Sequence, residues 1–174
     1  AQEGQIINGC LILHQLYYQS NQYECEDYCT KDYKAVLALR LTQVSREMFN
    51  MASNLKTIIM PEVTEIKEEG FAQTGAAAVF LPKLTKVGDF AFDGCKFKRL
   101  DAETFPNLVT IGKGGFYECK ITSVDLPSLQ QVGGKGFSGC QIELLNLPNL
   151  TSIGQEAFVE ARFASVQLPS LTSI

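Results

Sequence analysis

Residues 147–158 read LPNLTSIGQEAF, and residues 81–95 read LPKLTKVGDFAFDGC. Both stretches open on a Leu-Pro pair, and the proline of that pair recurs along the whole chain. The six prolines follow one another at intervals of 21, 24, 21, 21 and 21 residues, at Pro61, Pro82, Pro106, Pro127, Pro148 and Pro169. Self-similarity at a short fixed period is typical of repeat proteins. The sequence therefore predicts a stack of repeats.

Other residue types keep the same period. A phenylalanine lies ten residues after each of the first five prolines, and a β-branched residue lies five residues after each of them. The residue before each phenylalanine is glycine or alanine. A repeat this short cannot bury its own apolar face, so it must stack on its neighbours. We therefore predict an internal ladder of rings made by Phe92, Phe116, Phe137 and Phe158.

The residues that precede Pro127 alternate between apolar and polar. In Ile121–Asp125, Val124 points to one side, whereas Ser123 and Asp125 point to the other. The proline that follows ends the strand, because it has no N–H to donate. The predicted parallel strands are Phe97–Asp101, Ile121–Asp125, Ile142–Asn146 and Phe163–Gln167.

The repeat pattern is Leu-Pro-x-Leu-x-x-Ile-Gly-x-x-Ala-Phe-x-x-Cys, and it resembles the BspA-like (Treponema-type) leucine-rich repeat. The resemblance implies an α/β repeat solenoid, a right-handed stack of short parallel strands with few helices. It places the leucine-rich-repeat solenoid at residues 39–174, with one degenerate repeat, about five further repeats and a truncated last one. Residues 1–38 form a predicted N-terminal cap, since open solenoid ends need covering.

The function of such a chain is also implied by the resemblance. Family members are extracellular or surface-displayed proteins of host-associated bacteria and some protists, so the expected localisation is secreted or cell surface. The expected role is adhesion to a host or matrix protein or glycan through the exposed strand face. The alternative is a structural spacer or stalk in a larger surface protein.

The outward residues of the predicted strands are the candidate partner-binding site. Phe80 and Leu144 are apolar where the alternation predicts solvent, and Asp101, Asp125 and Asn146 form a row of carboxylates and amides. The full candidate set is Phe80, Arg99, Asp101, Ser123, Asp125, Leu144 and Asn146.

Composition restricts the classes of binding partner and of catalytic chemistry that are expected of the chain. The net charge of −4 and the pI near 5.1 disfavour nucleic acid and anionic membrane surfaces. No apolar run reaches the roughly 18 residues that a membrane-spanning helix needs, so no membrane insertion is expected. The single histidine, His14, has no serine or cysteine partner in a recognisable motif. We therefore predict no enzyme, no cofactor and no catalytic residues.

The six cysteines fall into two sets. Cys95, Cys119 and Cys140 share one repeat position, whose substitutes are small, so they are predicted to be buried free thiols. Cys10, Cys25 and Cys29 lie outside the repeats. We expect a disulfide from Cys10 to Cys25 or Cys29, because extracellular chains favour disulfides. A three-Cys, one-His zinc site with His14 is the alternative, and the prediction for metals is none.

The segment 1–38 is dense in tyrosine, which fits a cap or, alternatively, an aromatic recognition patch. A short helix is predicted at Tyr33–Leu39.

The 24-residue interval carries three extra residues, Ala102-Glu103-Thr104. These predict a local bulge with the flanking strands still in register. The last repeat stops at Ile174 without a polar cap, which predicts end-to-end self-association or a longer array.

Overall fold

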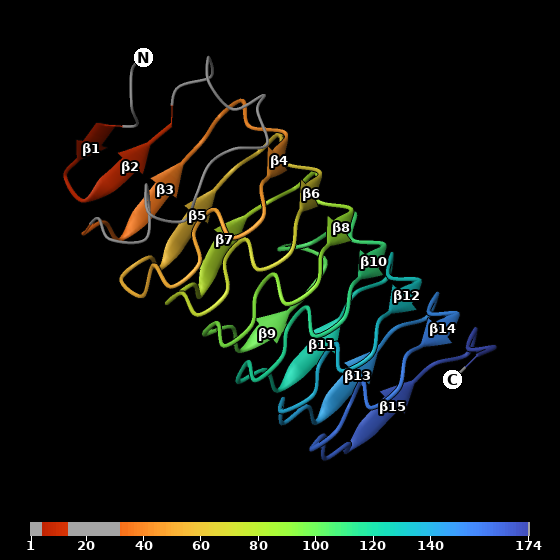
Figure 1. Cartoon of the computed structure of the whole chain (residues 1–174). Helices are drawn as coiled ribbons and strands as arrows, with labels where there is room; N and C mark the ends of the chain where they lie inside the picture. The colour runs from red at the N-terminus through yellow and green to blue at the C-terminus, as the bar shows by residue number, and fades with distance from the viewer. Residues whose placement is uncertain (1–4, 14–31, 174) are drawn as a thin grey trace.

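The structure is a computed structural model that describes residues 5–13 and 32–173. The described residues form fifteen β-strands and no helix, arranged as a two-layered stack (Figure 1). One layer is a single sheet, which we call the back sheet. The opposite layer is divided into two, the N-terminal front sheet and the C-terminal front sheet. The apolar core lies between the layers.

The three sheets have short strands. The N-terminal front sheet has the order β1 (Gln5–Ile7), β2 (Cys10–Ile12), β3 (Ala35–Leu37), β5 (Thr57–Ile59) and β7 (Ala78–Phe80). The C-terminal front sheet runs β15 (Ser165–Gln167), β13 (Leu144–Asn146), β11 (Ser123–Asp125), β9 (Arg99–Leu100). The back sheet runs β14 (Ser152–Ile153), β12 (Gln131–Val132), β10 (Thr110–Ile111), β8 (Lys86–Val87), β6 (Glu65–Ile66), β4 (Gln43–Val44).

Adjacent strands pair in parallel and in register, as expected for a stacked repeat. Val124 lies opposite Leu145 in the front layer, and Ile111 lies opposite Val132 in the back sheet. The exception is the first hairpin, in which β1 pairs antiparallel with β2. Each repeat thus contributes one strand to the front layer and one to the back, which confirms the predicted parallel solenoid.

The predicted phenylalanine ladder is confirmed. The rings of Phe92, Phe116, Phe137 and Phe158 are stacked, with successive centroids 5.3, 5.6 and 5.4 Å apart. The ladder continues through Phe71 to Phe49. Ring stacking at this spacing stabilises the fold in addition to the burial of large apolar surfaces, and the ladder runs through successive repeats of the core.

The glycine that follows four of the five β-branched residues marks a close approach between successive repeats, and Lys67 is the exception. A Cβ added to Gly133 would lie 2.7 Å from the carbonyl carbon of Gly112 and 2.7 Å from the backbone nitrogen of Lys113. Because those atoms belong to the backbone, they cannot move aside cheaply. The close approach of the neighbouring repeat therefore favours glycine at Gly133.

The repeated cysteines are free and buried, as predicted. Their thiols donate to backbone carbonyls of the preceding repeat: Cys119 Sγ lies 3.0 Å from the oxygen of Phe92, and Cys140 Sγ lies 3.2 Å from that of Phe116. Each thiol thus has an acceptor inside the core. Thr74 occupies the same repeat position, and its hydroxyl donates instead to the carbonyl of Phe71 in its own repeat at 2.9 Å.

Two predictions about helices are wrong. The segment predicted as the helix Tyr33–Leu39 contains strand β3, because Val36 fills an inward core position between Leu11 and Ile58. The few helices expected of an α/β solenoid are missing throughout 5–13 and 32–173. The corners of the repeats contain residues of positive φ four positions apart, such as Glu69 (φ 54°) and Gln73 (φ 55°), and these break any helix.

The 24-residue interval divides the front layer. Strand β9 stays in register with β11 but belongs to a different sheet from β7. The expectation that the flanking strands stay in register is therefore confirmed for β11 and wrong for β7. The inserted residues form a turn in which the backbone N–H of Phe105 donates to the carbonyl of Asp101 at 2.9 Å. In neighbouring repeats the equivalent carbonyl bonds across the sheet, as from Leu126 N–H to Asn146. The back sheet is continuous past this point.

The N-terminal segment contributes strands to the stack. The structure has Cys10 as a free thiol on β2, with its Sγ 3.9 Å from the carbonyl of Leu11. The expected disulfide from Cys10 is therefore not formed. Cys25, Cys29 and His14 lie outside the described residues. No helix long and apolar enough to cross a membrane occurs in residues 5–13 and 32–173.

Candidate interaction face

The front layer presents two outward rows of side chains. In the interior three-residue front strands the middle side chain points into the core, as Val124 and Leu145 do with 1% and 2% of their surface exposed. The first and third side chains point away from it. Because the strands pair in register, the outward side chains of successive repeats form rows that run across the strands.

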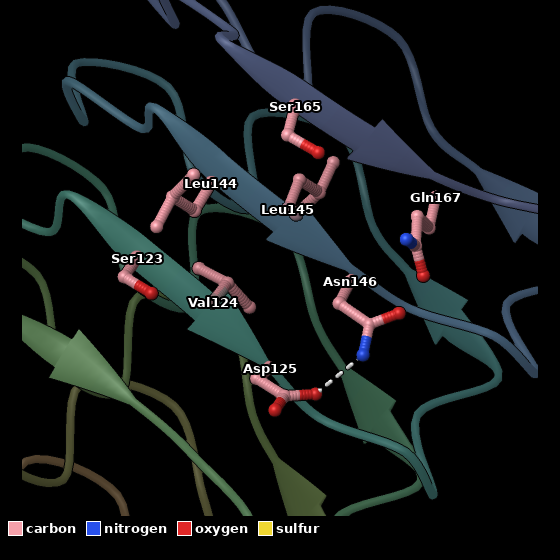
Figure 2. A pocket seen from close by; sticks show the side chains of 8 residues that line it. All are labelled: Ser123, Val124, Asp125, Leu144, Leu145, Asn146, Ser165 and Gln167. Carbon is pink, nitrogen blue, oxygen red and sulfur yellow. Dashed lines mark hydrogen bonds between the residues drawn. The ribbon is translucent and has the colours of Figure 1, made fainter.

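The C-terminal front sheet carries a shallow depression of about 230 Å³. It is centred on β11, β13 and β15, and Figure 2 shows how the side chains of these strands line it. The first outward row is serine, leucine, serine, and the second is carboxylate, amide, amide. The lining residues are Ser123, Val124, Asp125, Leu144, Leu145, Asn146, Ser165 and Gln167.

Two features define the chemistry of this depression. Leu144 is 51% exposed between the two serines, so it offers an apolar centre. Beside it, the Asn146 side-chain N–H₂ donates to a carboxylate oxygen of Asp125 at 2.8 Å (Figure 2). This bond holds both polar side chains in place across two strands. The depression thus combines an exposed aliphatic group with fixed donors and acceptors.

Asp101 takes part in the inserted turn. One of its carboxylate oxygens accepts hydrogen bonds from the backbone N–H of Thr104 at 3.0 Å and from its hydroxyl at 2.9 Å. Desolvation raises the pKa of Asp101, but the bonds from Thr104 and the charge of Arg99 outweigh it and lower that pKa overall. Asp101 closes the inserted turn, and Arg99 reaches its carboxylate at 3.6 Å.

The structure brings together four of the seven candidate residues. Ser123, Asp125, Leu144 and Asn146 line the depression. Arg99 lies on the neighbouring strand, opposite Ser123, and Phe80 lies on β7 in the other front sheet. The break in the front layer therefore separates Phe80 from the rest.

Ser165 and Gln167 complete the depression and were not among the candidate residues. They occupy the outward positions of β15, opposite Leu144 and Asn146. The repeat period alone could have found them, since they lie 21 residues after those two residues in the sequence.

No group of three or more histidine, cysteine or acidic side chains is placed to hold a metal ion among the residues that the structure describes. Burial raises the pKa of the Cys95 and Cys140 thiols to about 12. They are therefore neutral at physiological pH and enclosed in the core.

Comparison with known proteins agrees with this geometry. The sequence profile described as the BspA type leucine rich repeat region matches residues 42–109 and 109–174, with six copies. No curated protein matches the chain. Among solved structures, the chain is similar to a leucine-rich repeat protein from Bacteroides ovatus ATCC 8483, with 21% identity and a TM-score of 0.70. The match covers 94% of this chain and 49% of that one, so the chain spans about half the length of that protein.

Proposed function

Because the chain belongs to the BspA-type leucine-rich repeat family, we propose that it is an extracellular or cell-surface binding module. It adheres to a host or matrix protein or glycan through the exposed front layer. The observation that carries this proposal is the depression of the C-terminal front sheet, where exposed Leu144 lies beside the bonded pair of Asp125 and Asn146.

The fold supports this role through rigidity. The backbone groups of the front strands are engaged in ladders between repeats, so a partner meets side chains rather than backbone. Each repeat holds its outward side chains at about 4.8 Å from those of the next. A surface preorganised in this way loses little conformational entropy on binding, which favours affinity.

The chemistry of the depression suits either partner class. Leu144 provides an apolar contact of the kind found at the centre of protein interfaces. The carboxylate and amide groups of Asp125, Asn146 and Gln167 provide acceptors and donors for hydroxyl or amide groups. The net charge of −4 makes anionic polymers the poorer candidates.

The test is binding of the purified chain to arrays of matrix proteins and of glycans. For a ligand found in this way, the variant Leu144→Ser with Asn146→Ala should weaken binding about tenfold or more and leave the melting temperature unchanged. Met51→Ser is the matched control, because Met51 is an exposed apolar residue, 67% accessible, outside the front strands. Equal affinity of both variants would move the site away from the depression. Absence of any ligand on either array would favour the spacer role instead.

A further inference from the structure

The N-terminal front sheet carries an apolar row where the C-terminal front sheet carries a polar one. The third residues of β2, β3, β5 and β7 pair in register: Ile12 with Leu37, Leu37 with Ile59, and Ile59 with Phe80. In the C-terminal front sheet the same positions hold Asp125, Asn146 and Gln167. We call the four residues Ile12, Leu37, Ile59 and Phe80 the apolar row.

The other outward row of the N-terminal front sheet is small and uncharged. It consists of Cys10, Ala35, Thr57 and Ala78, paired in the same register. Within the described residues, the apolar row therefore has short side chains along this side. Its first three members are half-buried, and Phe80 is 53% exposed.

The break in the front layer leaves the end of this row open. Strand β7 is the last strand of its sheet, and its middle residue Val79 is only partly buried. The corresponding residues Leu100, Val124 and Leu145 are at most 2% exposed. Both Val79 and Phe80 are thus accessible where a regular repeat would have covered part of them.

Cations lie at one border of the N-terminal front sheet, beside the small outward row. Lys34 and Lys56 directly precede β3 and β5, and the backbone N–H of Lys56 donates to the carbonyl of Lys34 at 2.8 Å, so the two positions are adjacent. Both side chains are exposed, and neither forms an ion pair within the described ranges. Lys98 lies at the same position beyond the break. Elsewhere Lys83, Lys86 and Lys135 are paired with glutamates.

We propose that the N-terminal front sheet is a second docking surface, for an amphipathic protein segment that has apolar side chains along one face and carboxylates along its border. The apolar row takes the apolar face, with Phe80 as its anchor. Lys34 and Lys56 attract the carboxylates, in a chain whose net charge of −4 would otherwise repel an acidic partner. Hydrogen-bonding side chains are scarce on this surface, so it suits a protein segment better than a glycan.

This inference depends on the proposed function only for the expectation that the front layer binds partners. Its surface lies on the other side of the break from the depression, so the two can fail separately. The probe is a random peptide library displayed on phage and panned on the whole chain. Peptides that combine apolar residues with aspartate or glutamate should be enriched, and one of them is then synthesised and labelled.

Fluorescence anisotropy of the labelled peptide measures the affinity. The variant Phe80→Ser with Ile59→Thr should weaken binding at least about tenfold, since a few apolar anchors dominate the energy of an interface. The variant Lys34→Gln with Lys56→Gln should weaken it at low salt and remove most of its salt dependence. Leu144→Ser should bind as the wild type does. Unchanged melting temperatures show that each variant is folded.

Three results would overturn the inference. One is equal enrichment of peptides on the wild type and on the Phe80→Ser, Ile59→Thr variant. Another is enrichment of basic rather than acidic peptides. The third is binding that Leu144→Ser abolishes while Phe80→Ser leaves it intact, which would place the peptide in the depression and leave the proposed function standing.

Discussion

The phenylalanine ladder shows how a single repeated residue organises the core. Phe137 is fully buried and stacks on Phe116 and Phe158, whereas Phe158 is only partly buried because it has fewer repeats beyond it. Phe137→Ala should lower the free energy of unfolding by about 3–5 kcal/mol through the cavity that it leaves. Phe158→Ala is the matched control and should cost less. Urea unfolding of both variants is the measurement, and an equal loss would show that the ladder does not act as a core.

The buried thiols should make the fold sensitive to alkali. Burial raises the pKa of Cys95 and Cys140 to about 12 and raises that of Cys119 as well, whereas an unfolded thiol titrates near 8.5. A raised folded pKa means that the stabilisation is complete below about pH 8.5 and is lost as the pH rises through the folded values.

We therefore expect the urea midpoint to fall between pH 8 and pH 10.5, and to fall less in Cys119→Ala. The urea midpoint of Cys119→Ala is also compared with that of the wild type at pH 7, where the thiols are neutral in both the folded and the unfolded chain. A midpoint in Cys119→Ala that falls as steeply as in the wild type would assign the alkaline effect to other groups.

At the scale of the elements, the break between β7 and β9 depends on one turn. The carbonyl of Asp101 accepts from the inserted turn, and the structure gives the backbone N–H of Leu81 no bond corresponding to that of Leu126. We expect the Leu81 amide to exchange with solvent faster than the amides of Leu126 and Leu147, which bond to Asn146 and Gln167. Hydrogen exchange followed by NMR measures this.

Deletion of Ala102–Thr104 restores the regular spacing between Asp101 and Phe105. The shortened chain should fold, and the Leu81 amide should become protected, because the Asp101 carbonyl is then free to bond across the sheet. Exchange at Leu126 serves as the internal control. Loss of the folded state on deletion would show that the turn is needed for more than connection.

At the scale of the whole molecule, the last strand of the stack leaves apolar surface uncovered. Val166 and Phe163 are 45% and 42% exposed, whereas their counterparts Leu145 and Ile142 are buried. An uncovered strand edge beside apolar side chains is a template for association. The 174-residue chain should therefore gain mass with concentration in light scattering, and Val166→Lys should reduce this gain. Met51→Lys is the control, and a strictly monomeric wild type would contradict the expectation.

The sequence by itself determined the features that recur in every repeat. The parallel front strands, the stacked rings and the buried free thiols all follow from one rule: a short unit with a repeated apolar position must bury that position against its neighbours. The same rule placed Ser123, Asp125, Leu144 and Asn146 outward, because side chains alternate along a strand. Local residue patterns were sufficient where the same contact is made in every repeat.

Only the tertiary structure decided what depends on pairing between distant residues. The back sheet, the strand at Ala35–Leu37 and the break after Phe80 were missed, because backbone partners across the stack outweigh local helix and turn preferences. The depression exists because three repeats place their outward side chains together. The apolar row ends beside the repeat in which the Asp101 carbonyl accepts a hydrogen bond from the inserted turn. Hydrogen bonds between repeats decide these features, and the linear sequence does not show where such bonds are lost.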